Sequence, residues 1–253
     1  ACYNNRDFLE AKETLLDILA ADPENATAAF YLDFVTDAEN SADAGTLEYT
    51  PQLPTEVVDK KLDDLIERGD LADMWKDERL FKDAEWALYN VTDEDYFEKL
   101  ADKIALTDRE KAAKYFTSLL IRPAFDKNFK TILLRKALES GARGKIKLVS
   151  DRRFYRLNVP ELKGALSKQL VEIISVLAFE RVIVGEDLEK IMRAADETEQ
   201  IPAAKQDGKA GEIPAAVIAK RAELDGMNDF ALCVVFGVKP KDLARLYKEI
   251  YGD

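Results

Sequence analysis

The hydrophobic positions of this chain recur three or four residues apart over most of its length, which is the spacing of amphipathic helices. Near the N-terminus, Phe8, Ala11, Leu15 and Ile18 would share one face of a helix. Residues 22–25 (DPEN) then interrupt the pattern, because proline lacks an amide donor and disfavours helical geometry at the residue before it. A new apolar run follows at once, so we predict two antiparallel helices joined by a short turn.

This order of an aromatic residue, an alanine and two aliphatic residues, with Asp-Pro-x-Asn opening the next helix, resembles the tetratricopeptide repeat (TPR). The resemblance covers about the first 35 residues. It implies a helical groove in which the inner face of the first helix contacts a protein or peptide partner. In the family pattern a longer helix precedes residue 6, and this chain begins with Ala1 instead of Met. We therefore expect an upstream half-repeat in the native protein.

Helical spacing continues through the rest of the chain, with one exception. The predicted helices span residues 55–67, 92–104, 107–120, 125–140, 162–184, 186–196, 214–224 and 241–251. Thr92 and Thr107 would open two of them, and Gly141 would end a third. Residues 144–158 instead alternate polar and apolar around a central Ser-Asp pair, which is typical of a β-hairpin. The predicted fold class is therefore mainly α, with a TPR-like helical hairpin followed by a larger helical domain that carries one short β-hairpin.

Two polar stretches that contain Gly and Pro predict linkers and divide the chain. The predicted organisation is a TPR-like hairpin at 1–38, a linker at 39–54, a helical domain with a basic β-hairpin at 55–197, a second linker at 198–212, and C-terminal helices at 213–253 that pack on the preceding domain.

Composition is that of an ordinary helical protein with a substantial core. The chain has 253 residues, of which 47% are hydrophobic and 34% charged. Its two cysteines, Cys2 and Cys233, cannot form a disulfide framework, which favours a reducing compartment. Residues 170–184 form the longest apolar run, but they include three charged side chains, so we predict a buried helix and no membrane span. We predict a cytoplasmic protein, with export left open because the native N-terminus is expected upstream.

Charge is segregated along the chain, whose net charge is −12. Residues 1–110 hold 29 acidic and 11 basic side chains, whereas residues 111–170 hold 4 acidic and 15 basic ones. The basic residues concentrate in and around the predicted hairpin. The candidate surface for an anionic partner consists of Arg143, Lys145, Lys147, Arg152, Arg153 and Arg156.

Three interpretations of this basic surface stay open. It could pair internally with the acidic part of the chain or simply be a solvated face. A helix followed by a basic hairpin also resembles the end of a winged-helix domain, which would bind nucleic acid. Against that, the upstream sequence lacks a convincing helix-turn-helix, and the acidic remainder would repel DNA. The third interpretation is a docking surface for an acidic protein segment.

The chain has no histidine, which excludes Ser-His-Asp and Cys-His catalysis and leaves too few ligands for the usual zinc sites. The carboxylate clusters at residues 63–64, 93–95 and 186–187 fall near predicted helix starts or on exposed faces, where acids interact favourably with the helix dipole. We therefore predict no enzymatic activity and neither cofactor nor metal. The predicted function is a protein- or peptide-binding scaffold with a TPR-like groove, and the alternative is a nucleic-acid-binding regulator with a winged-helix-like basic hairpin.

Overall fold

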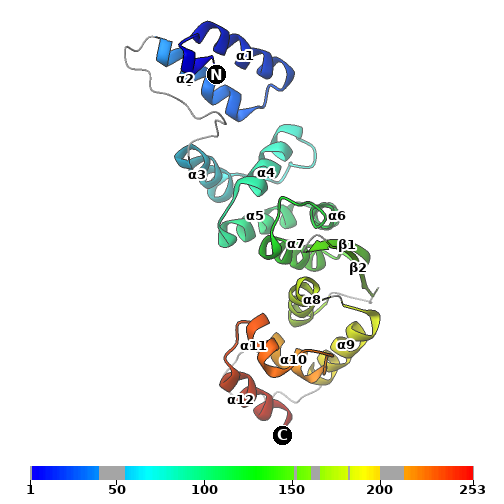
Figure 1. Ribbon diagram of the computed structural model, residues 1–253. Helices are drawn as coiled ribbons and strands as arrows, with labels where there is room; N and C mark the ends of the chain where they lie inside the picture. Colours follow the sequence, from blue (N-terminus) through cyan, green and yellow to red (C-terminus); the bar gives the residue numbers. More distant parts are fainter. Residues whose placement is uncertain are drawn as a thin grey trace. The chain divides into compact units, whose positions relative to one another are not determined.

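The structure is a computed structural model that describes residues 2–39, 55–150, 153–160, 166–181, 183–199 and 214–252. Within these ranges the chain forms twelve α-helices and a single two-stranded antiparallel sheet (Figure 1). The predicted fold class, mainly α with one short β-hairpin, is confirmed. None of the helices in the described parts is both long enough and apolar enough to cross a bilayer.

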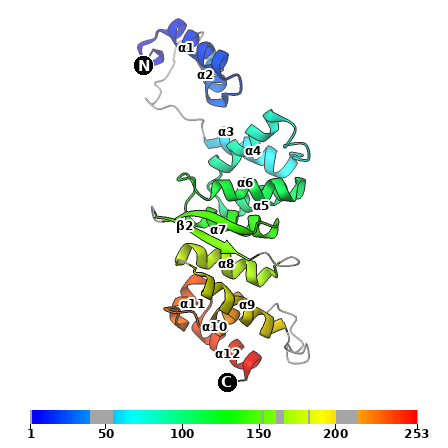
Figure 2. The same cartoon turned by 90° about the vertical axis from the view of Figure 1, so that its right-hand side faces the viewer.

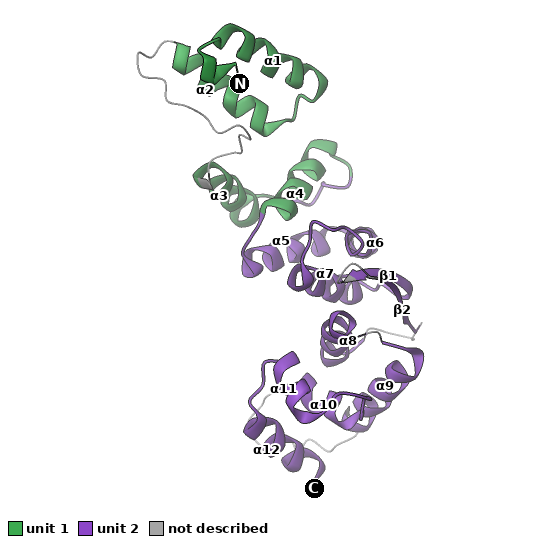
Figure 3. Ribbon diagram, viewed as in Figure 1, with its two compact units in different colours: residues 1–70, 76–90 green, residues 71–75, 91–253 purple. Residues whose placement is uncertain are grey.

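The chain divides into two compact units (Figure 3). Unit 1 comprises residues 1–70 and 76–90, and unit 2 comprises residues 71–75 and 91–253. The predicted linkers lie outside the described residues, apart from Glu39, Thr198 and Glu199, so the predicted domain boundaries stay predictions.

Unit 1 holds four helices, a 3₁₀ turn at Tyr3–Asn5 and a π-helical turn at Asp64–Arg68. The helices are α1 (Phe8–Ala21), α2 (Ala26–Glu39), α3 (Thr55–Asp63) and α4 (Glu78–Asn90). Unit 2 holds the other helices and the sheet: α5 (Glu94–Thr107), α6 (Arg109–Leu119), α7 (Lys127–Glu139), β1 (Gly144–Ser150), β2 (Arg153–Val159), α8 (Lys168–Glu180), α9 (Gly185–Glu199), α10 (Ala215–Arg221), α11 (Asp229–Val235) and α12 (Pro240–Tyr251).

Helices α1 and α2 form the hairpin that the N-terminal spacing predicts (Figures 1 and 2). Each begins at a side-chain cap: Asp7 accepts the N–H of Glu10 at 3.2 Å, and Asn25 accepts the N–H of Ala28 at 2.9 Å. Their shared core consists of Tyr3, Ala11, Val35 and Ala38, with Cys2, Phe8 and Leu15 packed against it. The hairpin is therefore present, whereas its membership of the TPR family stays a prediction.

The apolar stripe of α1 is only partly covered by α2. Ile18, which we expected on the buried face, is 40% exposed, and Leu9 and Leu16 are exposed as well. Phe34 of α2 is also exposed. The described part of the hairpin thus leaves apolar side chains on its surface.

The first three helices of unit 2 pack against one another, and the β-hairpin follows the last of them (Figure 2). Their aromatic and aliphatic side chains, among them Phe97, Phe116 and Leu133, are fully buried. Helix α7 packs on α8 as well as on α5 and α6, so most of its surface is covered. Helix α8 is itself the buried core helix that the apolar run from residue 170 predicts.

The N-caps of α5 and α6 lie one residue later than predicted. Asp93 accepts the N–H of Tyr96 at 3.0 Å, and Asp108 accepts the N–H of Lys111 at 3.1 Å. Aspartate caps a helix at least as well as threonine, so a Thr-Asp pair leaves the start ambiguous by one residue. The hydroxyl of Thr107 instead accepts the indole N–H of Trp75 at 2.7 Å.

We expect Ala11→Trp to destabilise the α1–α2 hairpin by about 1–3 kcal/mol, because Ala11 is 8% exposed and has no room for an indole. Ala20→Trp is the matched control, since Ala20 lies on an exposed position of the same helix. Hydrogen exchange of the α1 and α2 amides in the full chain measures the difference. Equal exchange in the two variants would refute the close approach of α2 at Ala11.

Candidate functional site

The β-hairpin presents its basic side chains on one face. Strands β1 and β2 pair without a bulge, and Ile146 faces Leu157 across the ladder. Both of these side chains are buried. Because side chains alternate between the two faces of a strand, the neighbours of Ile146 on β1 and of Leu157 on β2 point outward. Lys147 lies directly opposite Arg156 on that outward face. Like charges directly opposite each other destabilise a strand pair, so the pairing of Lys147 with Arg156 is electrostatically unfavourable.

Arg143 has a structural role that the sequence did not indicate. It is half-buried, and its Nη1 donates hydrogen bonds to the carbonyl oxygens of Leu138 (3.1 Å) and Ala142 (2.7 Å). These bonds satisfy carbonyls at the end of α7, where the chain turns through Gly141 at a φ of 101°. Burial lowers the pKa of Arg143 from its ordinary value.

The other predicted surface residues divide into two groups. Lys145, Lys147 and Arg156 lie on the outward face of the hairpin and are exposed. Arg152 and the side chain of Arg153 lie outside the described residues.

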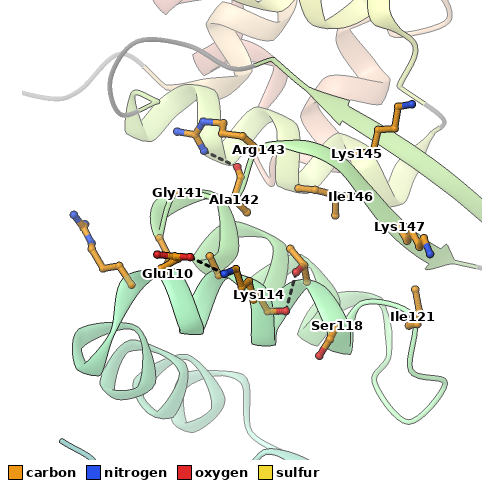
Figure 4. A pocket seen from close by; sticks show the side chains of 14 residues that line it. Glu110, Lys114, Ser118, Ile121, Gly141, Ala142, Arg143, Lys145, Ile146 and Lys147 are labelled. Carbon is orange, nitrogen blue, oxygen red and sulfur yellow. Dashed lines mark hydrogen bonds and ion pairs between the residues drawn. The ribbon is translucent and has the colours of Figure 1, made fainter. Parts of the chain in front are cut away.

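A groove of about 600 Å³ lies between α6 and β1 (Figure 4). Lys114, Ser118 and Ile121 lie along the side of α6, and Ile146 and Lys147 lie along β1. Its charged lining consists of the cations Arg109, Lys114, Arg143, Lys145 and Lys147 and the one carboxylate Glu110.

Glu110 does not neutralise this groove. It pairs with Lys114 at 2.6 Å on the exposed surface of α6, which leaves the other four cations of the lining without a described carboxylate partner. The groove also has an apolar part, because Ala113 and Ile146 line it and Ile121 is 42% exposed. The contribution of α6 was missed from the sequence, since its residues are separated from the hairpin by a whole helix. The excess of basic residues between 111 and 170 was the one signal that covered both sides.

Three basic residues of α7 pair with carboxylates of neighbouring elements. The ammonium of Lys136 is buried and contacts Glu98 at 2.9 Å and Asp102 at 2.7 Å, both on α5. Arg135 contacts Glu98 at 2.7 Å, and the α7 residue Lys127 contacts Glu180 of α8 at 2.5 Å. Internal pairing thus accounts for these three cations of α7. The exposed cations of the hairpin, Lys145, Lys147 and Arg156, form no ion pair with any described residue.

The ion pair between Glu98 and Lys136 shifts the pKa of both side chains. Burial raises the pKa of Glu98, but the hydrogen bonds and charges of Lys136 and Arg135 outweigh it, so the net pKa is lowered. Burial lowers the pKa of Lys136, but its hydrogen bonds to Asp102 and Glu98 outweigh burial and the net pKa is raised. Both groups are therefore held in their charged forms.

Each predicted carboxylate cluster has at least one member with a structural partner. Asp93 caps α5, and Asp64 pairs with Arg68 at 3.2 Å. Asp187 accepts hydrogen bonds from the N–H of Val184 (3.1 Å) and from Arg181 (2.9 Å). Among the described residues, no three His, Cys, Asp or Glu side chains are grouped so that they could hold a metal ion. The absence of enzymatic activity stays a prediction.

Comparison of the chain with protein-family models, with curated proteins and with solved structures found no match.

The ion pairs of α7 predict an acid sensitivity of unit 2. Because the pKa of Glu98 is lowered on folding, its contribution to stability is present above its unfolded pKa of about 4.3 and is lost as pH falls through the folded pKa. We expect Glu98→Gln to be less stable than the parent at pH 7 and to lose less stability than the parent between pH 7 and pH 3.

Chemical denaturation of the full chain at several pH values checks this expectation. Glu186→Gln is the control, because Glu186 forms only an exposed pair with Lys190 at 3.6 Å. A parent and a Glu98→Gln variant that lose the same stability on acidification would contradict the role assigned to this pair.

Proposed function

We propose that this chain is a non-enzymatic binding protein that holds an acidic segment of a partner protein in the groove between α6 and β1. The observation that carries the proposal is a set of cations left unpaired in an acidic protein. The chain has a net charge of −12, yet Lys145 and Lys147 at the groove contact no described carboxylate. Cations held close together repel one another, and a complementary anionic partner converts that repulsion into attraction.

The apolar lining favours a peptide as the ligand. Ala113, Ile121 and Ile146 offer contacts to aliphatic side chains, which a protein segment carries and a phosphate backbone lacks. An acidic peptide with some apolar residues would complement both parts of the groove.

Two features weigh against nucleic acid, the alternative function. A recognition helix must be free to enter the major groove of DNA, whereas α7 is covered by α5, α6 and α8. The cations of α7 that could contact phosphate, Arg135 and Lys136, are already paired with carboxylates.

The α1–α2 hairpin supports the same class of function. It exposes Leu9, Leu16, Ile18 and Phe34, which offer apolar side chains for a partner to contact. A scaffold with a TPR-like hairpin and a basic groove would bind partners through shape and charge without covalent chemistry.

We expect a fluorescently labelled peptide of alternating glutamate and valine with blocked termini to bind the full chain at low salt. The double variant Lys145→Glu, Lys147→Glu should bind at least about tenfold more weakly, because two attractive charges become repulsive. Fluorescence anisotropy measures both affinities. Binding should weaken as salt increases, since exposed charges are screened.

The matched control is Lys239→Glu, Lys241→Glu, which changes the net charge equally and has the same spacing in sequence. Both lysines are exposed at the start of α12, where acidic residues are tolerated. Equal weakening in the two variants, or no binding of the peptide at low salt, would overturn the proposal. A short DNA duplex that binds more tightly than the peptide and loses affinity in the hairpin variant would favour the alternative.

A further inference from the structure

One edge of strand β1 faces the groove instead of another strand. Across the hairpin, antiparallel residue pairs alternate between those that exchange backbone hydrogen bonds and those whose N–H and C=O groups point away from the partner strand. The N–H of Val149 donates to the carbonyl of Leu120, at the end of α6, with a donor–acceptor distance of 3.3 Å. Val149 therefore belongs to the second kind of pair, with its backbone groups directed toward α6.

The register is continuous, so the same orientation recurs every two residues along β1. The N–H and C=O groups of Lys145 and Lys147 must then point away from β2, along the edge that borders the groove. No described backbone or side-chain group pairs with them across that edge. Helix α6 contacts β1 at Leu120 and Val149, and farther along the strand the groove separates them.

This edge has the same two cations that carry the proposed function. An extended segment laid along it would place every second side chain on the face of Lys145 and Lys147. The alternate side chains would lie on the face of Ile146, which is buried and lines the groove. A strand with acidic residues at one set of positions and aliphatic residues at the other fits both faces.

We propose, resting on the proposed function, that the acidic segment binds as an extended strand added antiparallel to the free edge of β1. Backbone hydrogen bonds to Lys145 and Lys147 supply affinity that does not depend on sequence, and the two ammonium groups select carboxylates. Lysines on a free edge normally prevent strand addition, because a neutral strand would desolvate their charges without compensation. An acidic strand supplies that compensation, so the same lysines admit acidic partners and reject neutral ones.

The test uses the alternating glutamate–valine peptide with blocked termini, which contains three glutamates and three valines. It compares two forms of this peptide that are methylated at different backbone nitrogens. One form carries methyl groups on all glutamate nitrogens and the other on all valine nitrogens, so charge and composition are identical. In an antiparallel added strand, the residues opposite the two lysines are the glutamates, and their amides face β1. We expect methylation of the glutamate nitrogens to weaken binding at least about tenfold and methylation of the valine nitrogens to leave it within about threefold.

A second measurement reports on the protein side of the same bonds. The amide protons of Lys145 and Lys147 should exchange rapidly in the free full chain and slow down when the unmethylated peptide is added. The amide of Ile146, which lies within the hairpin ladder, is the internal control and should change little.

The two proposals fail in different ways. If the unmethylated peptide does not bind, the proposed function itself fails. If it binds but both methylated forms bind equally well and the amides of Lys145 and Lys147 stay unprotected, strand addition is overturned while the basic groove stands as a binding site. If both methylated forms lose affinity, protection of these two amides decides: protection supports the added strand, and its absence refutes it.

Discussion

The buried ammonium of Lys136 is the ionic contact that links α5 to α7 in unit 2. A buried cation destabilises a protein unless carboxylates surround it, and here Glu98 and Asp102 of α5 contact it directly. Glu139 of α7 also contacts this ammonium at 3.4 Å, and the two partners on α5 link that helix to α7. Two carboxylates of α5 are thereby directed toward α7. The lysines of β1, by contrast, have no described carboxylate partner.

A second lysine links α7 to the hairpin. Lys130 is buried, its Nζ donates to the carbonyl of Val149 at 2.8 Å, and burial lowers its pKa. Val149 also donates its N–H to Leu120, so this one residue of β1 is held by both α6 and α7. The contact fixes that end of the strand against the helices, and it sets the phase in which the backbone groups of Lys145 and Lys147 point away from β2. The exposed edge of β1 therefore follows from how the hairpin is anchored.

Local sequence patterns were sufficient for the elements that depend on neighbours in the chain. The hairpin and its inward residues Ile146 and Leu148 follow from alternation, and the end of α7 follows from Gly141, which adopts a positive φ. Whether each basic residue is paired with a carboxylate or exposed without one could not be predicted in the same way. Lys136 and Lys147 are both cations in one basic segment, and their difference depends on whether a residue such as Glu98, distant in sequence, lies alongside. That contact is a property of tertiary packing.

The same limit applies to the groove and to the N-terminal hairpin. Lys114 and Ser118 belong to a helix that was predicted, but nothing in their spacing shows that β1 lies opposite them. The period of α1 places Ile18 on the same stripe as Ala11, yet α2 covers Ala11 and leaves Ile18 exposed, because a partner helix covers less than the full width of an apolar stripe.

The contrast between the groove and the whole chain bears on the size of a suitable partner. At physiological ionic strength, charges are screened beyond about 8 Å, so a ligand seated in the groove interacts mainly with the nearby cations. A long polyanion extends past the groove and meets a protein of net charge −12, which repels it. A short acidic segment avoids that repulsion and still gains the contacts of Lys145, Lys147 and the apolar lining. Under the proposed function, this balance of local attraction and overall repulsion favours a short acidic peptide over an extended nucleic acid.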